Sequence, residues 1–600
     1  MKNRLLKRSE VKESYCWNIK DIYISDEDWE SDYEQIKSKI SYYNRLKNDA
    51  EKNAKSLLKL LDFNFQIEKN AEKLYVYANQ KSHEDMTVSI YQDMAARAAA
   101  LLVKLEDSAA FISPFIMSLG EEKIDKFVAS EPGLRIYRRY FDIIFRKKEH
   151  ILDEKTESML ARVSDISSAS SDIFAMFNNA DIKFPVIKDE NGEDVQITNG
   201  KYVSFLRSSN RDVRKAAFDG LYSVYNAHKN MLAATYRANT KQRYFYAETR
   251  KYGSAMEYSL SDANIPVSVY EKLIEATRNY LPLLHKYVGI RKKALGLSKL
   301  HMYDMYVPLV KDMQMKISYE EAKRLVYEAM EPLGKEYQQF LKIGFEGGWI
   351  DVYENEGKRS GAYSWGCYES HPYVLLNHQD DLNSVFTLAH EMGHALHSYY
   401  SNRNQPYIYA GYKIFVAEVA STCNEALLVN YLLKHSKDKN EKLYLLNYFL
   451  EQFRTTFFRQ TMFAEFEKIT HEMTQRDETL TAENMCAIYK QLNEDYFGEE
   501  AFVDDEIAIE WARIPHFYTP FYVYQYATGF AASVSISSAI LAGDKKVLDG
   551  YMEFLKSGGS KDPIDLLKLC GVDMNTGRPV EMCMKTFERL LEQFSRELED

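Results

Sequence analysis

Apolar residues recur every three or four positions along most of the chain, the spacing that places them on one face of a helix. Polar residues fill the positions between them, and proline and glycine are rare inside these stretches. The clearest examples are residues 36–61, 101–119, 271–297 and 319–343. The sequence therefore predicts a mainly α fold.

Strand-like patterns are confined to two regions. Residues 184–187 and 194–197 flank the turn-forming residues 190–192, an arrangement typical of a β-hairpin. Residues 349–379 alternate tyrosine-rich apolar runs with glycine-containing turns, so they indicate a small β-sheet directly before a helix.

A domain boundary is expected between residues 180 and 205. It divides the chain into an N-terminal helical domain, 1–180, and a domain that holds the chemistry, 181–600. We find no repeat of fixed period, so a solenoid is not supported.

Composition and charge exclude several classes of protein. The chain has 600 residues, of which 46% are hydrophobic and 28% charged, so it is neither disordered nor of low complexity. Its net charge of −11 is unfavourable for binding phosphate backbones, and no nucleic-acid partner is expected. The six cysteines form no CxxC pair, which favours a reducing compartment.

The beginning of the chain does not resemble an export signal. Basic residues within 1–8 are followed by the polar stretch 9–13, where a secretory signal needs an apolar core. No run approaches the roughly 18 apolar residues that span a bilayer. We expect a cytoplasmic protein without a membrane partner, and both a monomer and a homodimer remain open.

The motif HExxH at residues 390–394 is the strongest chemical signal. Residues four apart share one face of a helix, so His390 and His394 can bind one ion while Glu391 projects toward the same side. Neutral imidazole suits zinc, and we expect one Zn²⁺ per chain. Gly393 inside this helix costs about 1 kcal/mol relative to alanine, which suggests that another segment approaches closely there.

Two residues compete for the place of third ligand. His397 lies on the same face, but at 1.5 Å per residue it is about 7.5 Å further along the axis, so we assign it to packing or to contact with a ligand. Glu418 stands out as a carboxylate within an apolar helix and is the better candidate. Glu425, seven residues later, either hydrogen-bonds a ligand histidine or is a solvated helix charge.

These groups favour hydrolysis of a carbonyl compound. Zinc lowers the pKa of bound water to about 7, and Glu391 can accept the proton of that water and pass it to the leaving amine. The similar pair His471-Glu472 lacks a second imidazole four residues after the first and is treated as a chance match.

Donors to the developing oxyanion are expected in the aromatic segment 514–530. His516 is the favoured donor, and Tyr522 and Tyr526 share a face if the segment after Pro520 is helical. Tyr524 is a candidate for substrate binding, and the alternative for each tyrosine is a place in the core.

A second candidate substrate contact lies in residues 357–364. The exposed backbone around Gly361, Ala362 and Tyr363 can pair with an extended peptide as an added strand, and the alternative is a plain turn.

Four motifs together resemble a known family. They are GKRSGAYSWG at 357–366, HEMGHALHS at 390–398, FVAEVASTCNE at 415–425 and HFYTPFYVYQYATG at 516–529. In this order they resemble the oligoendopeptidase F group of the thimet oligopeptidase-like zinc metallopeptidases, over most of residues 180–590.

The resemblance implies a mainly α, closed helical bowl with a deep substrate channel and with zinc on its floor. His390, His394 and Glu418 would be the ligands and Glu391 the general base, while His516 and the tyrosines within 522–526 would contact the substrate carbonyl. The expected function is cleavage of internal bonds in short unstructured oligopeptides. A peptide-binding protein without catalysis and a carboxypeptidase are the alternatives.

Overall fold

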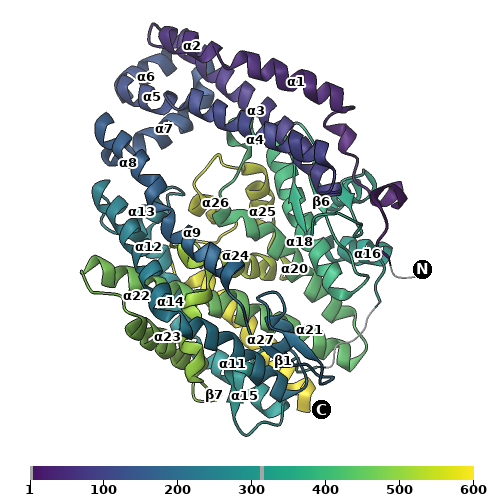
Figure 1. Cartoon of the computed structure of the whole chain (residues 1–600). Helices are drawn as coiled ribbons and strands as arrows, with labels where there is room; N and C mark the ends of the chain where they lie inside the picture. Colours follow the sequence, from purple (N-terminus) through teal and green to yellow (C-terminus); the bar gives the residue numbers. More distant parts are fainter. Residues whose placement is uncertain (1–3, 311–315, 600) are drawn as a thin grey trace. The chain divides into compact units, whose positions relative to one another are not determined.

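The computed structural model describes residues 4–310 and 316–599. The chain is 72% helical with only small sheets, so the predicted mainly α fold is confirmed (Figure 1). Among the described residues, none of the helices is both long enough and apolar enough to span a membrane.

The chain forms two compact units, each assembled from three separate segments of the sequence. Unit 1 contains residues 1–149, 314–428 and 539–562, whereas unit 2 contains residues 150–313, 429–538 and 563–600. The division into sequence domains 1–180 and 181–600 stays a prediction, as does the closed bowl with its channel.

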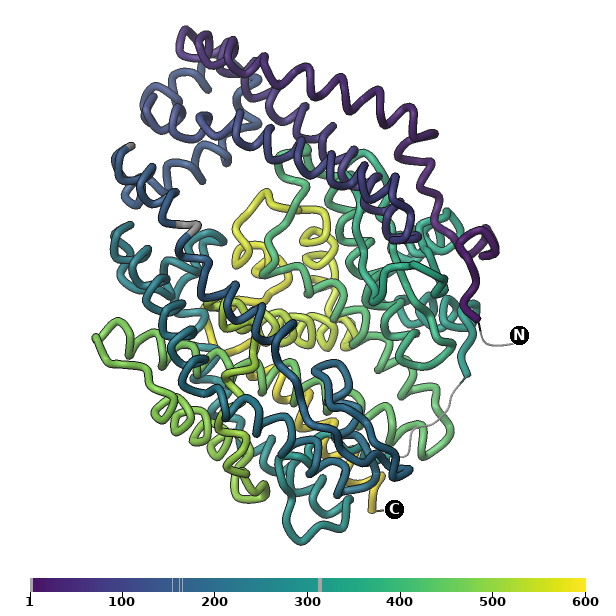
Figure 2. The backbone as a smooth tube through the Cα atoms, in the orientation of Figure 1, coloured from purple at the N-terminus to yellow at the C-terminus, as the bar shows by residue number. Residues whose placement is uncertain are grey.

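Unit 1 begins with a layer of helices. Helices α3 and α4 lie side by side in Figures 1 and 2, and α1 and α2 pack on α3. The indole of Trp29 is fully buried and donates to the carbonyl of Leu74 at 2.9 Å. The helices that begin in the N-terminal segment are α1 (Asp26–Lys39), α2 (Tyr42–Ala50), α3 (Ala54–Glu84), α4 (Ser89–Ala109), α5 (Ile112–Leu119), α6 (Glu121–Ser130) and α7 (Arg138–Arg146).

A three-stranded sheet in the order β4-β6-β5 lies in the central segment of unit 1. Strand β4 (Ile350–Asp351) runs parallel to β6 (Tyr373–Leu375), and β5 (Tyr363–Trp365) runs antiparallel to it. The buried core of the N-terminal helices continues into β6 through Tyr373 and Leu375.

The remaining helices of unit 1 include the one that carries the HExxH motif. Helix α18 packs on β5 and β6, which confirms the small sheet predicted beside it. These helices are α16 (Tyr319–Ala329), α17 (Lys335–Glu346), α18 (Leu382–Asn404), α19 (Tyr407–Ala410), α20 (Ile414–His435) and α25 (Lys545–Ser557).

Unit 2 is built mostly from helices, with two pairs of very short strands. The hairpin predicted around residues 190–192 is present, with β1 (Val186–Lys188) antiparallel to β2 (Asp194–Gln196). Strand β3 (Leu300–His301) pairs in parallel with β7 (Ala501–Phe502).

The long helix α12 is central to unit 2, where it packs on α9, α13, α22 and α23. The helices that begin in this unit are α8 (Glu154–Ser167), α9 (Ala169–Met176), α10 (Tyr202–Leu206), α11 (Arg211–Ala227), α12 (Lys229–Thr249), α13 (Ala255–Ser261), α14 (Val267–Asn279), α15 (Leu281–Ala294), α21 (Lys439–Gln452), α22 (Arg459–Gln475), α23 (Ala482–Phe497), α24 (Tyr524–Leu541), α26 (Pro563–Leu569) and α27 (Arg578–Glu599).

The helical stretches predicted from periodicity are helical, but they are interrupted. The stretch 271–297 breaks at Tyr280, because Pro282 lacks the N–H that a continuous helix needs and instead stands in the first turn of α15. The stretch 319–343 breaks before Gly334, whose φ of +89° lies outside the helical region.

Candidate metal centre

Helix α18 presents the HExxH motif from a well-anchored position. Its first turn is capped by Asp381, whose carboxylate accepts the N–H of Ser384 at 2.8 Å. Val385, Leu388 and Met392 are fully buried on its apolar face. His390 and His394 therefore project from a helix that packing holds in place.

Helix α20 crosses α18 at Gly393. A Cβ atom at that position would lie 2.6 Å from the Cα of Ser421 and 2.8 Å from the carbonyl oxygen of Ala420. Both distances are shorter than van der Waals contact, so only glycine permits the two backbones to approach this closely. The close approach that the sequence suggested at Gly393 is the backbone of α20.

A buried hydrogen-bond chain fixes the same crossing. The amide of Asn424 donates to the carbonyl oxygen of Ala389 at 3.0 Å, and its side-chain oxygen accepts the hydroxyl of Tyr337 at 2.9 Å. Asn424 and Tyr337 have no exposed surface. Breaking such a buried bond leaves an unsatisfied polar group at a cost of about 1–3 kcal/mol.

The crossing brings three donor atoms together, from His390, His394 and Glu418. The Nε2 atoms of the two histidines are 3.2 Å apart, and each lies 3.4 Å from Oε2 of Glu418. A tetrahedral ion with ligand bonds of about 2.0–2.1 Å separates its ligands by about 3.3 Å. The donor types and their spacing thus fit a zinc ion held by two imidazoles and one carboxylate.

Two further groups orient these donors. Nδ1 of His390 donates to Glu425 at 2.5 Å, so Nε2 is the ring nitrogen that faces the other donors. The hydroxyl of Ser421 donates to Oε2 of Glu418 at 3.0 Å. Of the two interpretations left open for Glu425, the geometry matches the hydrogen bond to a ligand histidine.

The electrostatics of the group favour positive charge between the imidazoles. Burial lowers the pKa of His390, but hydrogen bonds to Glu418 and Glu425 outweigh burial and raise the pKa to about 10. Burial opposes ionisation of Glu418, yet the two histidines hold the pKa of Glu418 well below its usual value. A cation at this point therefore meets an anionic partner that stays ionised.

Glu391 and His397 are both buried on α18, and burial favours the neutral form of each. Glu391 is 7% exposed, and burial raises the pKa of its carboxyl above the ordinary value. His397 is buried and stacks on the ring of Tyr412 with centroids 3.8 Å apart. Burial lowers the pKa of His397 to about 3, so its imidazole stays neutral and packs.

The loop with Gly361, Ala362 and Tyr363 lies at an edge of the unit 1 sheet, because β5 is the terminal strand in the order β4-β6-β5 formed by the described residues. Asn377 donates to the carbonyl oxygen of Gly361 at 2.7 Å and holds the loop. Gly361 has a φ of +83°, so the turn needs glycine at this position.

In unit 2, the aromatic segment brings three predicted residues together. The ring of His516 stacks on Tyr522 at 5.8 Å and meets the edge of Tyr526 at 6.0 Å. All three are partly exposed. Burial lowers the pKa of His516, which favours its neutral form.

Two expectations about this segment are corrected by the structure. Tyr522 precedes α24 instead of sharing a helical face with Tyr526, because Phe521 has a φ of +61° and its N–H bonds Glu467 at 2.9 Å. Tyr524 is only 3% exposed and packs on Tyr270, with the ring centroids 4.9 Å apart, so it belongs to the core and not to a substrate surface.

Asn424, Ser421 and Tyr337 are contacts of the site that the sequence does not predict. Asn424 carried a usable signal, since a buried amide in an apolar helix next to Glu425 must find a partner. Tyr337 carried none, because its partner lies 87 positions away.

Family models and known proteins match this chain over almost its whole length. The family model described as peptidase family M3 matches residues 204–586, and the one described as oligopeptidase F matches residues 116–184. Oligopeptidase PepF of Bacillus subtilis is 46% identical over 98% of this chain and 88% of its own length. A chromosomal oligoendopeptidase F of Lactococcus lactis subsp. cremoris is 42% identical over 99% and 98%.

Two solved structures are also similar to this chain over almost its whole length. A putative peptidase from Chlamydophila abortus is 36% identical, with a TM-score of 0.94 and coverage of 99% of this chain and 100% of that one. Oligoendopeptidase-F from Enterococcus faecium is also 36% identical, with a TM-score of 0.75 and coverage of 96% and 99%.

The helix crossing generates a first prediction. Gly393→Ala places a methyl group against the backbone of α20, so the free energy of unfolding falls by about 1–3 kcal/mol and metal binding at the candidate site weakens. Denaturant unfolding and metal titration measure both effects. Gly411→Ala is the matched control, because a Cβ there meets open space. Equal stability of the two variants contradicts the close crossing.

The orientation of His390 generates a second prediction. Glu425→Gln keeps the size of the side chain but weakens the bond to Nδ1, so the metal affinity of the candidate site drops about 10–100-fold. Competition with a chromophoric chelator gives the dissociation constant. Glu346→Gln, an exposed carboxylate on α17, leaves it unchanged. Unaltered affinity in the Glu425 variant refutes the orienting role.

Proposed function

Because the chain belongs to peptidase family M3, we propose that it is a zinc-dependent endopeptidase that cleaves internal bonds of short unstructured oligopeptides in the cytoplasm. The family confirms the resemblance predicted from four motifs and makes the chain a peptidase. Zinc, the endopeptidase mode and the roles of individual residues belong to the proposal.

One observation carries the proposal: three donor atoms from two helices lie within 3.4 Å of one another at a crossing that only glycine permits. His390, His394 and Glu418 would hold the ion. A bound zinc ion supplies Lewis acidity and lowers the pKa of water to about 7 at this point.

Glu391 is proposed as the general base. It neighbours His390 on α18 and lies largely out of solvent, and burial raises the pKa of its carboxyl. A carboxylate with a raised pKa is a stronger base, so Glu391 accepts the proton of the attacking water and then delivers it to the departing amine nitrogen.

The aromatic group of unit 2 is proposed to bind the substrate carbonyl. His516, Tyr522 and Tyr526 contact one another and keep part of their surface exposed. The imidazole N–H and the phenol hydroxyls donate hydrogen bonds that strengthen as the carbonyl oxygen gains negative charge.

The edge of β5 is proposed to bind the main chain of the peptide. Gly361, Ala362 and Tyr363 reach this edge, where an extended peptide can add as a strand. Tyr363 is held by a 2.7 Å hydrogen bond between its hydroxyl and Nδ1 of His83. Main-chain pairing tolerates varied side chains, which suits a peptidase with many substrates.

The role of Glu391 is tested by Glu391→Gln. The variant binds one zinc per chain but loses about 10²–10⁴ in kcat, because the amide accepts no proton. Metal analysis and cleavage of a peptide blocked at both ends provide the two readouts. A chelator also abolishes the parent activity.

The chance match to the motif at residues 471–472 supplies the matched control. Glu472→Gln changes the same residue type in the pair His471-Glu472, so it leaves turnover intact. Normal turnover by Glu391→Gln rules out the mechanism. Release of single C-terminal residues, with no cleavage of the blocked peptide, makes the protein a carboxypeptidase instead.

The carbonyl-binding role is tested by His516→Ala and Tyr526→Phe. Each removes one donor, so each lowers kcat by about 10²–10³-fold with little change in stability. Tyr524→Phe is the control, because its buried ring acts through packing and the variant keeps its kcat. If the Tyr524 variant loses as much kcat as the Tyr526 variant, the assignment fails.

A further inference from the structure

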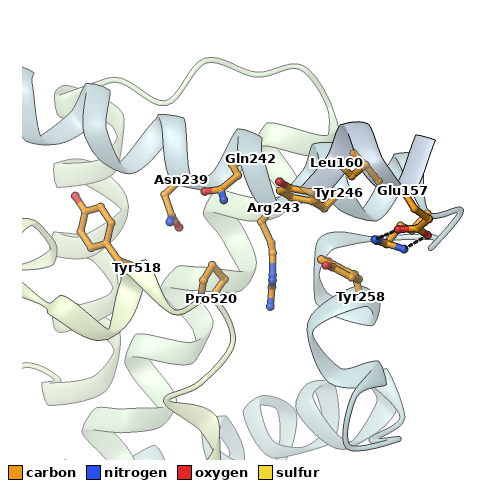
Figure 3. A pocket seen from close by; sticks show the side chains of 10 residues that line it. Glu157, Leu160, Asn239, Gln242, Arg243, Tyr246, Tyr258, Tyr518 and Pro520 are labelled. Carbon is orange, nitrogen blue, oxygen red and sulfur yellow. Dashed lines mark hydrogen bonds and ion pairs between the residues drawn. The ribbon is translucent and has the colours of Figure 1, made fainter. Parts of the chain in front are cut away.

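Unit 2 contains a cavity that the proposed function does not use. Its volume is about 410 Å³, and one face of α12 forms a wall through Asn239, Arg243 and Tyr246 (Figure 3). Tyr258 of α13 lines it as well, together with Tyr518 and Pro520. Figure 3 shows the Arg243 side chain extending between Pro520 and Tyr258.

The guanidinium of Arg243 contacts uncharged side chains in this cavity. Its Nε donates to the hydroxyl of Ser259 at 2.7 Å, and its guanidinium lies 4.7 Å from the ring centroid of Tyr258. None of the described residues places a carboxylate within ion-pair distance of it. Burial lowers the pKa of Arg243, yet a guanidinium remains charged in proteins.

The neighbouring arginine of the same cavity has a carboxylate partner. Arg250, on the same wall, forms two bonds of 2.8 Å to the carboxylate of Glu157. This fork-to-carboxylate geometry is the arrangement that arginine prefers. Arg243 offers the same fork, but none of the described acidic residues forms an ion pair with its two terminal nitrogens.

A second polar group nearby also lacks a partner. Asn239 precedes Arg243 by one helical turn, is 5% exposed, and has a side-chain oxygen without a hydrogen-bond partner among the described residues. A buried acceptor of this kind costs about 1–3 kcal/mol. A ligand with both a carboxylate and an N–H can satisfy Arg243 and Asn239 together.

The wall formed by Tyr518 and Pro520 connects this cavity to the proposed substrate contact. Tyr518 ends the short 3₁₀ helix η11 (Pro515–Tyr518), which also contains His516. A peptide bound at His516 therefore has this cavity beside the same segment of unit 2.

We propose that the cavity is a carboxylate-binding subsite for the peptide, with Arg243 as its anchor. The proposal rests on the proposed function, because it takes the ligand to be a peptide. Two sources supply the same planar carboxylate next to an N–H: the C-terminus of the peptide and the side chain of an acidic residue.

The test measures peptide binding in the Glu391→Gln background, so that no cleavage interferes. Four labelled peptides of one length carry a free or amidated C-terminus and a glutamate or glutamine near that end. Dissociation constants are measured for the parent, for Arg243→Gln and Arg243→Lys, and for Lys241→Gln. Lys241 is exposed on the same helix and serves as the matched control.

We expect one of the two carboxylates to improve binding to the parent by about tenfold or more. Arg243→Gln removes this preference by weakening only the favoured peptide, Arg243→Lys keeps part of it, and Lys241→Gln retains all of it. A contrast between acid and amide termini identifies the C-terminus as the source, whereas a contrast between glutamate and glutamine identifies the side chain.

Two results overturn the inference: an undiminished preference in Arg243→Gln, or equal weakening of all four peptides in that variant. Chelator-sensitive cleavage of the neutral peptide by enzyme that retains Glu391 is measured in parallel. If that cleavage is normal, either of these two results rejects the carboxylate subsite but leaves the proposed function standing. When no peptide is cleaved in a metal-dependent way, the proposed function fails instead.

Discussion

The candidate metal centre depends on one close contact, the crossing of α18 and α20 at Gly393. A side chain at this position would overlap the backbone of Ser421, and the axes of the helices would have to separate. Separation would carry Glu418 away from His390 and His394, because the carboxylate is attached to the helix that moves. The glycine thus sets the distance between ligands although it ligates nothing.

The polar contacts around the crossing follow from that distance. Asn424 reaches the carbonyl oxygen of Ala389, and Glu425 reaches the far nitrogen of His390, only because the backbones are this close. The first contact satisfies a buried amide and the second orients a partly exposed imidazole, so the orientation of the candidate ligands and the stability of the crossing have one cause.

Most other buried charges described in the chain are paired, in contrast to Arg243. In unit 1, Lys358 and Arg8 both meet Asp351, and in unit 2 the carboxylate of Glu510 meets Arg459. Removing one partner from such a set typically costs about 3–5 kcal/mol. Arg243 resembles an arginine that has lost its acidic partner, because no carboxylate among the described residues forms an ion pair with its guanidinium.

The sequence by itself determined what depends on short spacing: the helix with two imidazoles four residues apart, the apolar helix that carries Glu418, the hairpin, and the small sheet before α18. Its four motifs also determined the family. Tertiary structure decided what depends on contacts between distant segments. It determined which backbone meets Gly393 and that Tyr524 turns into the core. It also placed Tyr522 outside α24 and Arg243 beside residues from α13 and from segment 515–520. The physical reason is that helical periodicity specifies which residues share a face, whereas the partner of that face depends on how the whole chain packs.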